Sequence, residues 1–187
     1  MQNMDNMTLI VAIIVAIIVA VAVGWLVSQR RRQTHLRERF GPEYDRAVAA
    51  VGTTGKAATV LERREKRVAA YHIRPLSDDE RRGFSGAWQH TQAKFVDDPA
   101  AAVTEADALV SEVMTTRGYP MAEFDRRAED LTVEHASVID HYRAAREIVE
   151  RHVRHEASTE DLRQALMHYR ALFADLLNDR PEARRSA

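Results

Sequence analysis

The sequence predicts an all-α protein made of an N-terminal transmembrane helix, a charged helical connector and a small cytoplasmic bundle of about five helices. Three observations predict this fold. Residues 9–27 carry no charged side chain. Glycine and proline number only 7 and 5 in 187 residues, a scarcity typical of helical chains. From residue 76 onward, apolar side chains recur at intervals of three and four, the period of one helical face.

The uncharged stretch at residues 9–27 has the length of a membrane span. As a helix with a rise of about 1.5 Å per residue it extends about 29 Å, close to the ~30 Å hydrocarbon core of a bilayer. Only a helix satisfies all backbone hydrogen bonds within such a segment. We therefore expect a transmembrane helix at residues 9–28, preceded by a short extracytoplasmic N-terminus at residues 1–8.

The flanking charges predict the orientation of this span. No Lys or Arg precedes it, whereas arginines crowd the residues that follow it. By the positive-inside rule, the N-terminus faces out of the cell membrane and the C-terminal domain is cytoplasmic. A tryptophan at the end of the span and the arginines after it are expected to contact lipid headgroups. This set comprises Trp25, Arg30, Arg31, Arg32, Arg37 and Arg39.

A cleaved signal peptide is the alternative interpretation of the same stretch. Cleavage would release an exported soluble domain whose new N-terminus lies at residues 24–28. Signal peptides need a basic leading segment, a shorter apolar region and a small-x-small cleavage site. Here residues 1–8 carry Asp5 as their only charged side chain, and no such cleavage site follows. The pattern favours an uncleaved signal anchor.

Small residues recur every four positions within the span, at Ala12, Ala16, Ala20 and Gly24. This spacing places them on one helix face, where two backbones can approach closely. The pattern predicts a homodimer formed through the transmembrane helix. Alanine is also simply common in membrane helices, which is the competing explanation of the row.

The charge is distributed unevenly along the rest of the chain. Residues 29–74 contain twelve Lys and Arg against five Asp and Glu, whereas residues 75–179 contain twelve against twenty-one. We expect a basic juxtamembrane connector at residues 29–75, attracted to anionic lipid. An acidic bundle at residues 76–178 follows, and residues 179–187 form a flexible tail.

Capping signals mark the helices of the bundle. SDDE at residues 77–80 matches a capping box, in which the Ser and Glu side chains bond each other's backbone N–H. Ser158 and Asp161 have the same spacing. Asp98 followed by proline predicts another helix start, and Gly118 predicts a helix end. A short helix that includes Met121 is expected before the two long final helices.

The motifs that would specify a chemistry are incomplete or missing. The chain has no cysteine, which excludes disulfides, thiolate nucleophiles and cysteine-ligated metals. GTTGK at residues 52–56 partly matches a phosphate-binding loop, but it lacks the first glycine and has Ala57 where Ser or Thr is required. We therefore expect no nucleotide site, no other cofactor and no catalytic residue.

Histidines are concentrated in the last two predicted helices. His152 and His155 have a spacing that would let them share a metal ion, with Glu156 nearby. The sequence has neither the Glu-x-x-His of di-iron bundles nor the second histidine of a zincin. A membrane-bound enzyme, or a metal- or ligand-binding domain that uses these helices, is the rival to a purely structural role.

The sequence thus predicts a membrane-anchored protein that acts through protein–protein contacts, as a tether or scaffold. An unidentified cytoplasmic protein and the lipid bilayer are the expected partners. Nucleic acid is not expected, because the basic segment lies beside the membrane and the attached domain is acidic.

Several segments resemble one group of bacterial proteins. They include LRERFGPEYDRAV, REKRV, FVDDPAAAVTEAD, EVMTTRGYP and EASTEDLRQALMHYRALF. The chain is similar, over nearly its whole length, to actinobacterial-type single-pass membrane proteins with no assigned function. The resemblance implies a membrane anchor and imports no activity, cofactor or site residue.

Overall fold

The structure, a computed structural model, describes residues 2–120 and 123–178, and for residues 2–15 it describes the helical backbone but not the side chains. Within this part every regular element is a helix, which confirms the all-α prediction. The predicted tail at residues 179–187 and Met121 of the predicted short helix lie outside the described residues.

The chain divides into two compact units, Met1–Leu61 and Glu62–Ala187. The division falls inside helix α3 (Thr54–Ala69). Residues 62–75, the last part of the predicted connector, therefore belong to the second unit. The two units are described separately.

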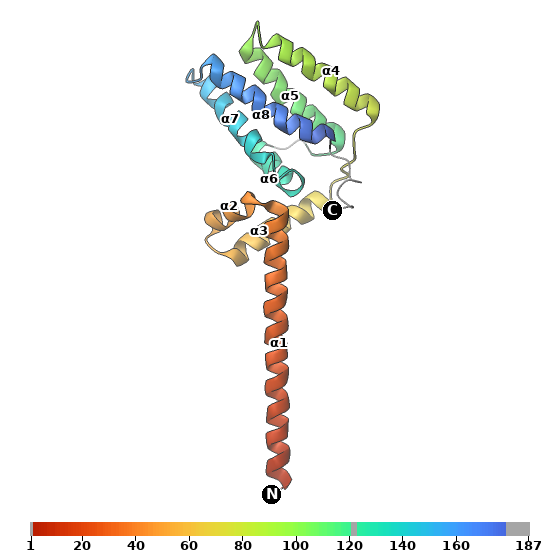
Figure 1. Ribbon diagram of the computed structural model, residues 1–187, viewed down its shortest axis with the longest axis vertical. Coiled ribbons are helices and arrows are strands. Elements are labelled where there is room, and N and C mark those ends of the chain that lie inside the picture. The colour runs from red at the N-terminus through yellow and green to blue at the C-terminus, as the bar shows by residue number, and fades with distance from the viewer. Residues whose placement is uncertain (1, 121–122, 179–187) are drawn as a thin grey trace. The chain divides into compact units, whose positions relative to one another are not determined.

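The first unit consists of α1 (Gln2–Phe40), α2 (Pro42–Val51) and the beginning of α3 (Figure 1). The first part of the predicted helical connector continues the helix of the apolar stretch, because α1 runs without a break to Phe40. Gly41 then turns the chain with a φ of +50°, and Pro42 occupies the first turn of α2, where its missing N–H is not needed. As a result α2 packs back against α1.

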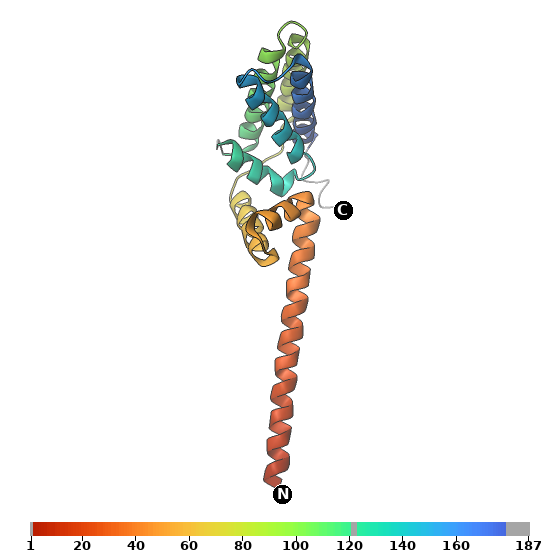
Figure 2. The same cartoon turned by 90° about the vertical axis from the view of Figure 1, so that its left-hand side faces the viewer.

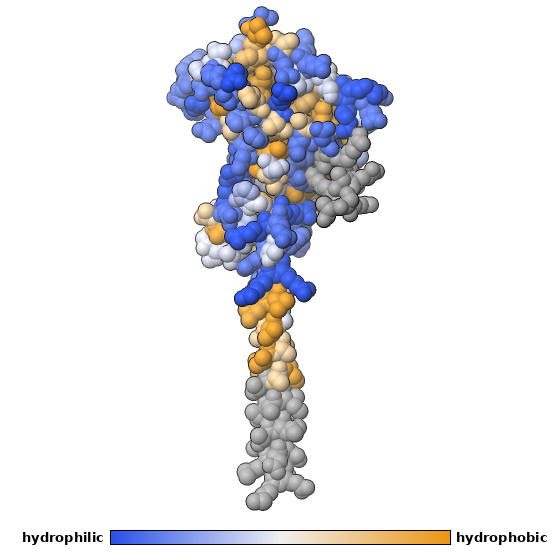
Figure 3. Space-filling model, viewed as in Figure 1, coloured by the Kyte–Doolittle hydropathy of each residue, from blue (hydrophilic) through white to orange (hydrophobic). Residues whose placement is uncertain are grey.

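Residues 16–27 of α1 expose all their side chains. Figure 3 shows this apolar surface and the hydrophilic surface that follows it along the helix. None of the described helices combines the length and the apolar character that crossing a membrane requires. Residues 9–15 of the predicted span lie outside the residues whose side chains are described.

The second unit contains the predicted helical bundle. Its helices are α4 (Asp78–Lys94), α5 (Pro99–Arg117), α6 (Phe124–Glu134), α7 (Ile139–Val153) and α8 (Thr159–Asn178). The final helix, α8, packs against both α5 and α7, while α4 packs on α5 and α6 on α7 (Figures 1 and 2).

The predicted caps of the bundle are confirmed. Ser77 accepts from the Glu80 N–H at 3.2 Å, and the Glu80 carboxylate accepts from the Ser77 N–H at 2.8 Å. Ser158 and Asp161 repeat this reciprocal pair at the start of α8. Asp98 accepts from the N–H of Ala101 at 2.9 Å. These bonds satisfy backbone donors that the helix starts leave without partners.

The core of the bundle is built from apolar side chains on facing helices. Trp88 of α4 stacks on Phe173 of α8, with ring centroids 4.7 Å apart. Tyr142 and Tyr169 are fully buried where α7 meets α8. Large aromatic side chains therefore fill the contact between these two helices.

The segment between α3 and α4 is held against the end of α5. The Arg74 N–H donates to the carbonyl of Arg117 at 2.8 Å. Arg117 is itself buried, and its guanidinium donates to the carbonyl of Leu176 at 3.1 Å, at the end of α8. A cation at this place satisfies carbonyl groups that a helix end leaves without intrahelical partners.

Candidate functional site

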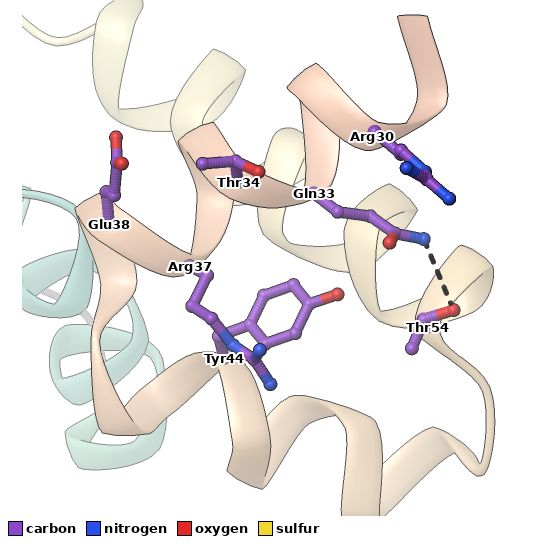
Figure 4. Close-up of a pocket in the computed structure, with 7 residues that line it drawn as sticks. All are labelled: Arg30, Gln33, Thr34, Arg37, Glu38, Tyr44 and Thr54. Atoms are coloured by element: carbon purple, nitrogen blue, oxygen red, sulfur yellow. Dashed lines mark hydrogen bonds between the residues drawn. The ribbon is translucent and has the colours of Figure 1, made fainter. Parts of the chain in front are cut away.

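A pocket of about 450 Å³ lies in the first unit, beside the end of the exposed apolar stretch (Figure 4). Side chains from the last three turns of α1 form one wall, and residues from α2 and the start of α3 form the other. Ligand pockets commonly have volumes of about 300–1,000 Å³. The lining residues are Arg30, Gln33, Thr34, Arg37, Glu38, Tyr44 and Thr54.

Two of the arginines predicted to meet lipid headgroups line this pocket, and they differ in their partners. Arg37 forms an ion pair with Asp45 at 3.1 Å and lies over the Tyr44 ring, 5.3 Å from its centroid. Arg30 is exposed and has no ion pair among the described residues. The pocket therefore holds one arginine whose charge is not matched by a carboxylate.

The other predicted headgroup residues lie outside the pocket. Arg31 is exposed, while Arg32 and Arg39 interact with other parts of the protein. Trp25, in the apolar stretch, exposes 62 % of its surface. Within the arginine cluster, Arg30 and Arg37 line the pocket, whereas the other predicted headgroup arginines do not.

Tyr44 is a site residue that sequence reasoning missed. The residue is only 3 % exposed, yet its hydroxyl points toward Gln33 and Thr54 in the pocket (Figure 4). Among the described residues this hydroxyl has no hydrogen-bond partner. The ring of Tyr44 is buried, but its hydroxyl is not one of the buried polar atoms without a partner, so it is open to the pocket and can donate to a ligand there.

Gln33 and Thr54 join the two walls of the pocket. The Gln33 Nε2 donates to Thr54 Oγ1 at 3.5 Å, the long limit of a hydrogen bond. Thr54 belongs to the GTTGK segment. Gly52 of that segment ends α2 with a φ of +81°, and the Lys56 N–H donates to Thr53 Oγ1 at 3.4 Å. The segment thus forms a link between two helices, in place of the strand-to-helix loop of nucleotide-binding proteins.

Part of the predicted self-association face lies among the described side chains. Ala16, Ala20 and Gly24 are exposed, and Ala12 lies outside the side chains that the structure describes. A Cβ atom added at Gly24 would meet no other atom within 4 Å. The face is open in a single chain, and the predicted pairing stays a prediction.

The two histidines considered as metal ligands lie at the end of α7. His152 is in the last turn, and His155 follows the helix with a left-handed φ of +60°. The helical spacing that would bring both side chains to one face therefore ends before His155. Over residues 16–120 and 123–178, no three His, Cys, Asp or Glu side chains gather as a metal ion would require.

A different pair of histidines meets between α7 and α8. His141 and His168 place their Nδ1 atoms 3.0 Å apart. In such a bond one ring nitrogen donates and the other accepts. Burial and the neighbouring His141 lower the pKa of His168. The pair contributes a hydrogen bond between the helices and supplies only two metal ligands.

The buried tyrosines of the bundle lie near charged groups. Burial raises the pKa of Tyr142 to about 12. Burial and the nearby Asp107 carboxylate raise the pKa of Tyr169 as well. Both phenols therefore hold their protons more strongly than an exposed tyrosine does. This cluster stabilises the neutral forms of its tyrosines.

Two further hollows lie on the bundle. One of about 310 Å³ follows α4 and α8 over Trp88 and Phe173. The other, of about 550 Å³, lies over α6 and α7, where the Arg146 guanidinium is 5.3 Å from the centroid of the Phe124 ring. Both hollows are open to solvent, and polar and apolar side chains line each of them.

Comparison with known proteins adds no assignment to this geometry. The chain matches no known protein family, no curated protein and no solved structure.

Proposed function

We propose that this is a single-pass membrane protein, anchored by residues 9–27, whose helical bundle works on the cytoplasmic side as a tether or scaffold. The observation that supports the anchor is the exposure of every side chain from residue 16 to residue 27 along an unbroken helix. A helix that is apolar all round is stable in water only when something covers it. A bilayer covers all sides at once.

Protein–protein contact is the role that the bundle supports best. Many of its charged groups are engaged in helix caps and ion pairs, such as the Ser77–Glu80 cap and the Arg67–Asp130 pair. The aromatic and arginine side chains in the hollow over α4 and α8 are residue types enriched at protein interfaces. The rival role, an enzyme or metal-binding domain built on the histidine-bearing helices, lacks a three-ligand cluster in the described part of the chain.

The anchor predicts that charges placed in its middle release the protein from membranes. Replacing Ile18 and Val19 together by Arg costs about 2.5–3.5 kcal/mol per residue at the centre of a membrane helix. We expect the wild-type chain to stay in the membrane fraction after carbonate washing and the double variant to leave it. Replacing the exposed Ala49 and Ala50 by Arg adds the same charge outside the span and should change nothing. Carbonate-resistant retention of the Ile18/Val19 variant would contradict the anchor.

The absence of cysteine makes the orientation directly measurable. A single cysteine introduced as Asn3→Cys is expected to react with a membrane-impermeant maleimide in intact cells. A single cysteine introduced as Ser186→Cys should react only after the cells are opened. Labelling of Ser186→Cys in intact cells would contradict the predicted orientation. It would show either that the C-terminal domain faces out of the cell or that signal cleavage has released it as an exported domain.

If the chain self-associates through the small-residue face, substitutions on that face should weaken dimerisation. Replacing Ala16 and Ala20 by Leu fills the groove that allows two backbones to approach, so the signal in a membrane two-hybrid assay should fall severalfold. Replacing Ile17 and Val21 by Leu is the matched control on other faces of the helix. An equal signal from all three chains would exclude this face as the dimer contact.

A further inference from the structure

We propose that the pocket between α1, α2 and the start of α3 binds a phosphate ester, with Arg30 and Tyr44 as its principal ligands. The site is distinct from general attraction between arginines and a membrane, because it selects one arginine and adds hydroxyl and amide donors from three helices. The phosphate chemistry does not depend on the proposed anchoring. Only the assignment of a lipid headgroup as the source of the phosphate rests on it.

The donors of the pocket match the needs of a phosphate group. Arg30 offers a planar guanidinium that can bond two phosphate oxygens at once, and no carboxylate among the described residues competes for it. The Tyr44 hydroxyl has no hydrogen-bond partner among the described residues, and it points toward Gln33 and Thr54 in the pocket that Arg30 also lines (Figure 4). Bonds from such donors to an anion are stronger than those between neutral groups.

The remaining lining residues add donors and place negative charge at the edge. Gln33 has a second amide hydrogen beyond the one directed at Thr54, and the Thr54 hydroxyl can donate while it accepts from Gln33. Glu38 points away from these groups (Figure 4). The pocket therefore presents donors at its centre, which favours an anion over a cation.

The position of the pocket favours a lipid headgroup as the source of the phosphate. Along a helix, Arg30 and Gln33 lie about 4.5 Å and 9 Å beyond Val27, the last residue of the apolar stretch. The headgroup layer on each side of a bilayer is about 5–7 Å thick. If residues 9–27 span the bilayer, Arg30 lies at the level of the lipid phosphates and Gln33 lies just beyond the headgroup layer. The volume of about 450 Å³ also leaves room for the ester substituent.

The test is a titration of the full chain, purified in a neutral detergent, with phosphatidic acid dispersed in the same detergent. Arg30→Gln and Tyr44→Phe are each expected to weaken binding at least fivefold. Arg31→Gln removes the same charge from the adjacent exposed position, outside the pocket, and should change binding less than twofold. Tyr44→Phe keeps the buried ring, and unchanged helicity in circular dichroism verifies the fold of each variant.

The arms of the titration separate the sources of the phosphate. Glycerol 3-phosphate and inorganic phosphate test soluble sources; binding as tight as that of phosphatidic acid, with the same dependence on Arg30 and Tyr44, supports the site and assigns it to a free phosphate ester. Oleic acid tests anionic charge without phosphate and should bind at least tenfold more weakly. Equal loss in the Arg30 and Arg31 variants, an unaffected Tyr44→Phe chain, or equal binding of oleic acid overturns the proposal.

These measurements are made without a bilayer, so their outcome is independent of the anchoring test. A chain that fails the carbonate wash can still bind phosphate at this pocket. Equally, a chain that resists the carbonate wash can lose the same phosphate affinity in Arg30→Gln and in Arg31→Gln, which would contradict the pocket alone. The two proposals are therefore contradicted by different results.

Discussion

Gly118→Ala is expected to lower the stability of the bundle by about 3 kcal/mol or more, which corresponds to a fall in Tm of at least about 6 °C for a chain of this size. Gly118 ends α5 with a φ of +98°, a conformation that side chains disfavour by about 1–2 kcal/mol. A Cβ atom there would also lie 2.4 Å from the carbonyl oxygen of His72. Because that obstacle is backbone, a rotamer change cannot relieve it.

The control for Gly118 is a glycine of the same bundle with opposite expectations. Gly86 lies inside α4, and a Cβ atom added there meets nothing within 4 Å. Gly86→Ala should therefore stabilise the bundle by up to about 1 kcal/mol, the difference in helix propensity. Thermal unfolding followed by circular dichroism at 222 nm checks both variants. A Gly118→Ala chain that melts within 2 °C of the wild type would show that the segment at His72 yields without cost.

The two roles of Gly118 show what can be predicted from the sequence and what cannot. The sequence predicts the glycine as a helix end, since RGYP combines a C-cap residue with a proline stop. Its second role, close contact with the backbone of His72, depends on residues more than forty positions away. Local signals such as the capping boxes at Ser77 and Ser158 involve residues three apart, so they can be predicted from one short stretch.

The candidate pocket was predicted only in part, for the same reason. The arginines that follow the apolar stretch are visible as a charge cluster, and Arg30 is among them. Tyr44 carries no signal of its own, because a tyrosine at the start of a helix is equally compatible with a buried and an exposed position. Its unpaired hydroxyl becomes apparent only when Gly41 turns α2 back against α1. The meeting of His141 with His168 similarly needs the packing of α7 on α8.

Arg67→Met is expected to destabilise the second unit by about 2–3 kcal/mol. The Arg67 Nε donates at 2.7 Å to Asp130 of α6, whose side chain is only 3 % exposed. The Tyr71 hydroxyl donates to the same carboxylate at 2.9 Å. Loss of the guanidinium leaves a buried negative charge with one neutral donor, and breaking a buried pair in this way typically costs 3–5 kcal/mol. The partial exposure of Arg67 reduces that figure.

Companion variants separate the buried charge from general effects of losing an arginine. Arg63→Met removes an exposed arginine from the same helix and should cost less than about 0.5 kcal/mol. Tyr71→Phe removes one hydrogen bond to a charged group and should cost about 1.5 kcal/mol. The double variant Arg67→Met with Asp130→Leu removes both charges and is expected to recover much of the loss, because no uncompensated carboxylate remains. Chemical denaturation with urea measures all four. A double variant less stable than Arg67→Met alone would contradict this explanation. The stability lost in Arg67→Met would then come from lost packing and not from an uncompensated Asp130 carboxylate.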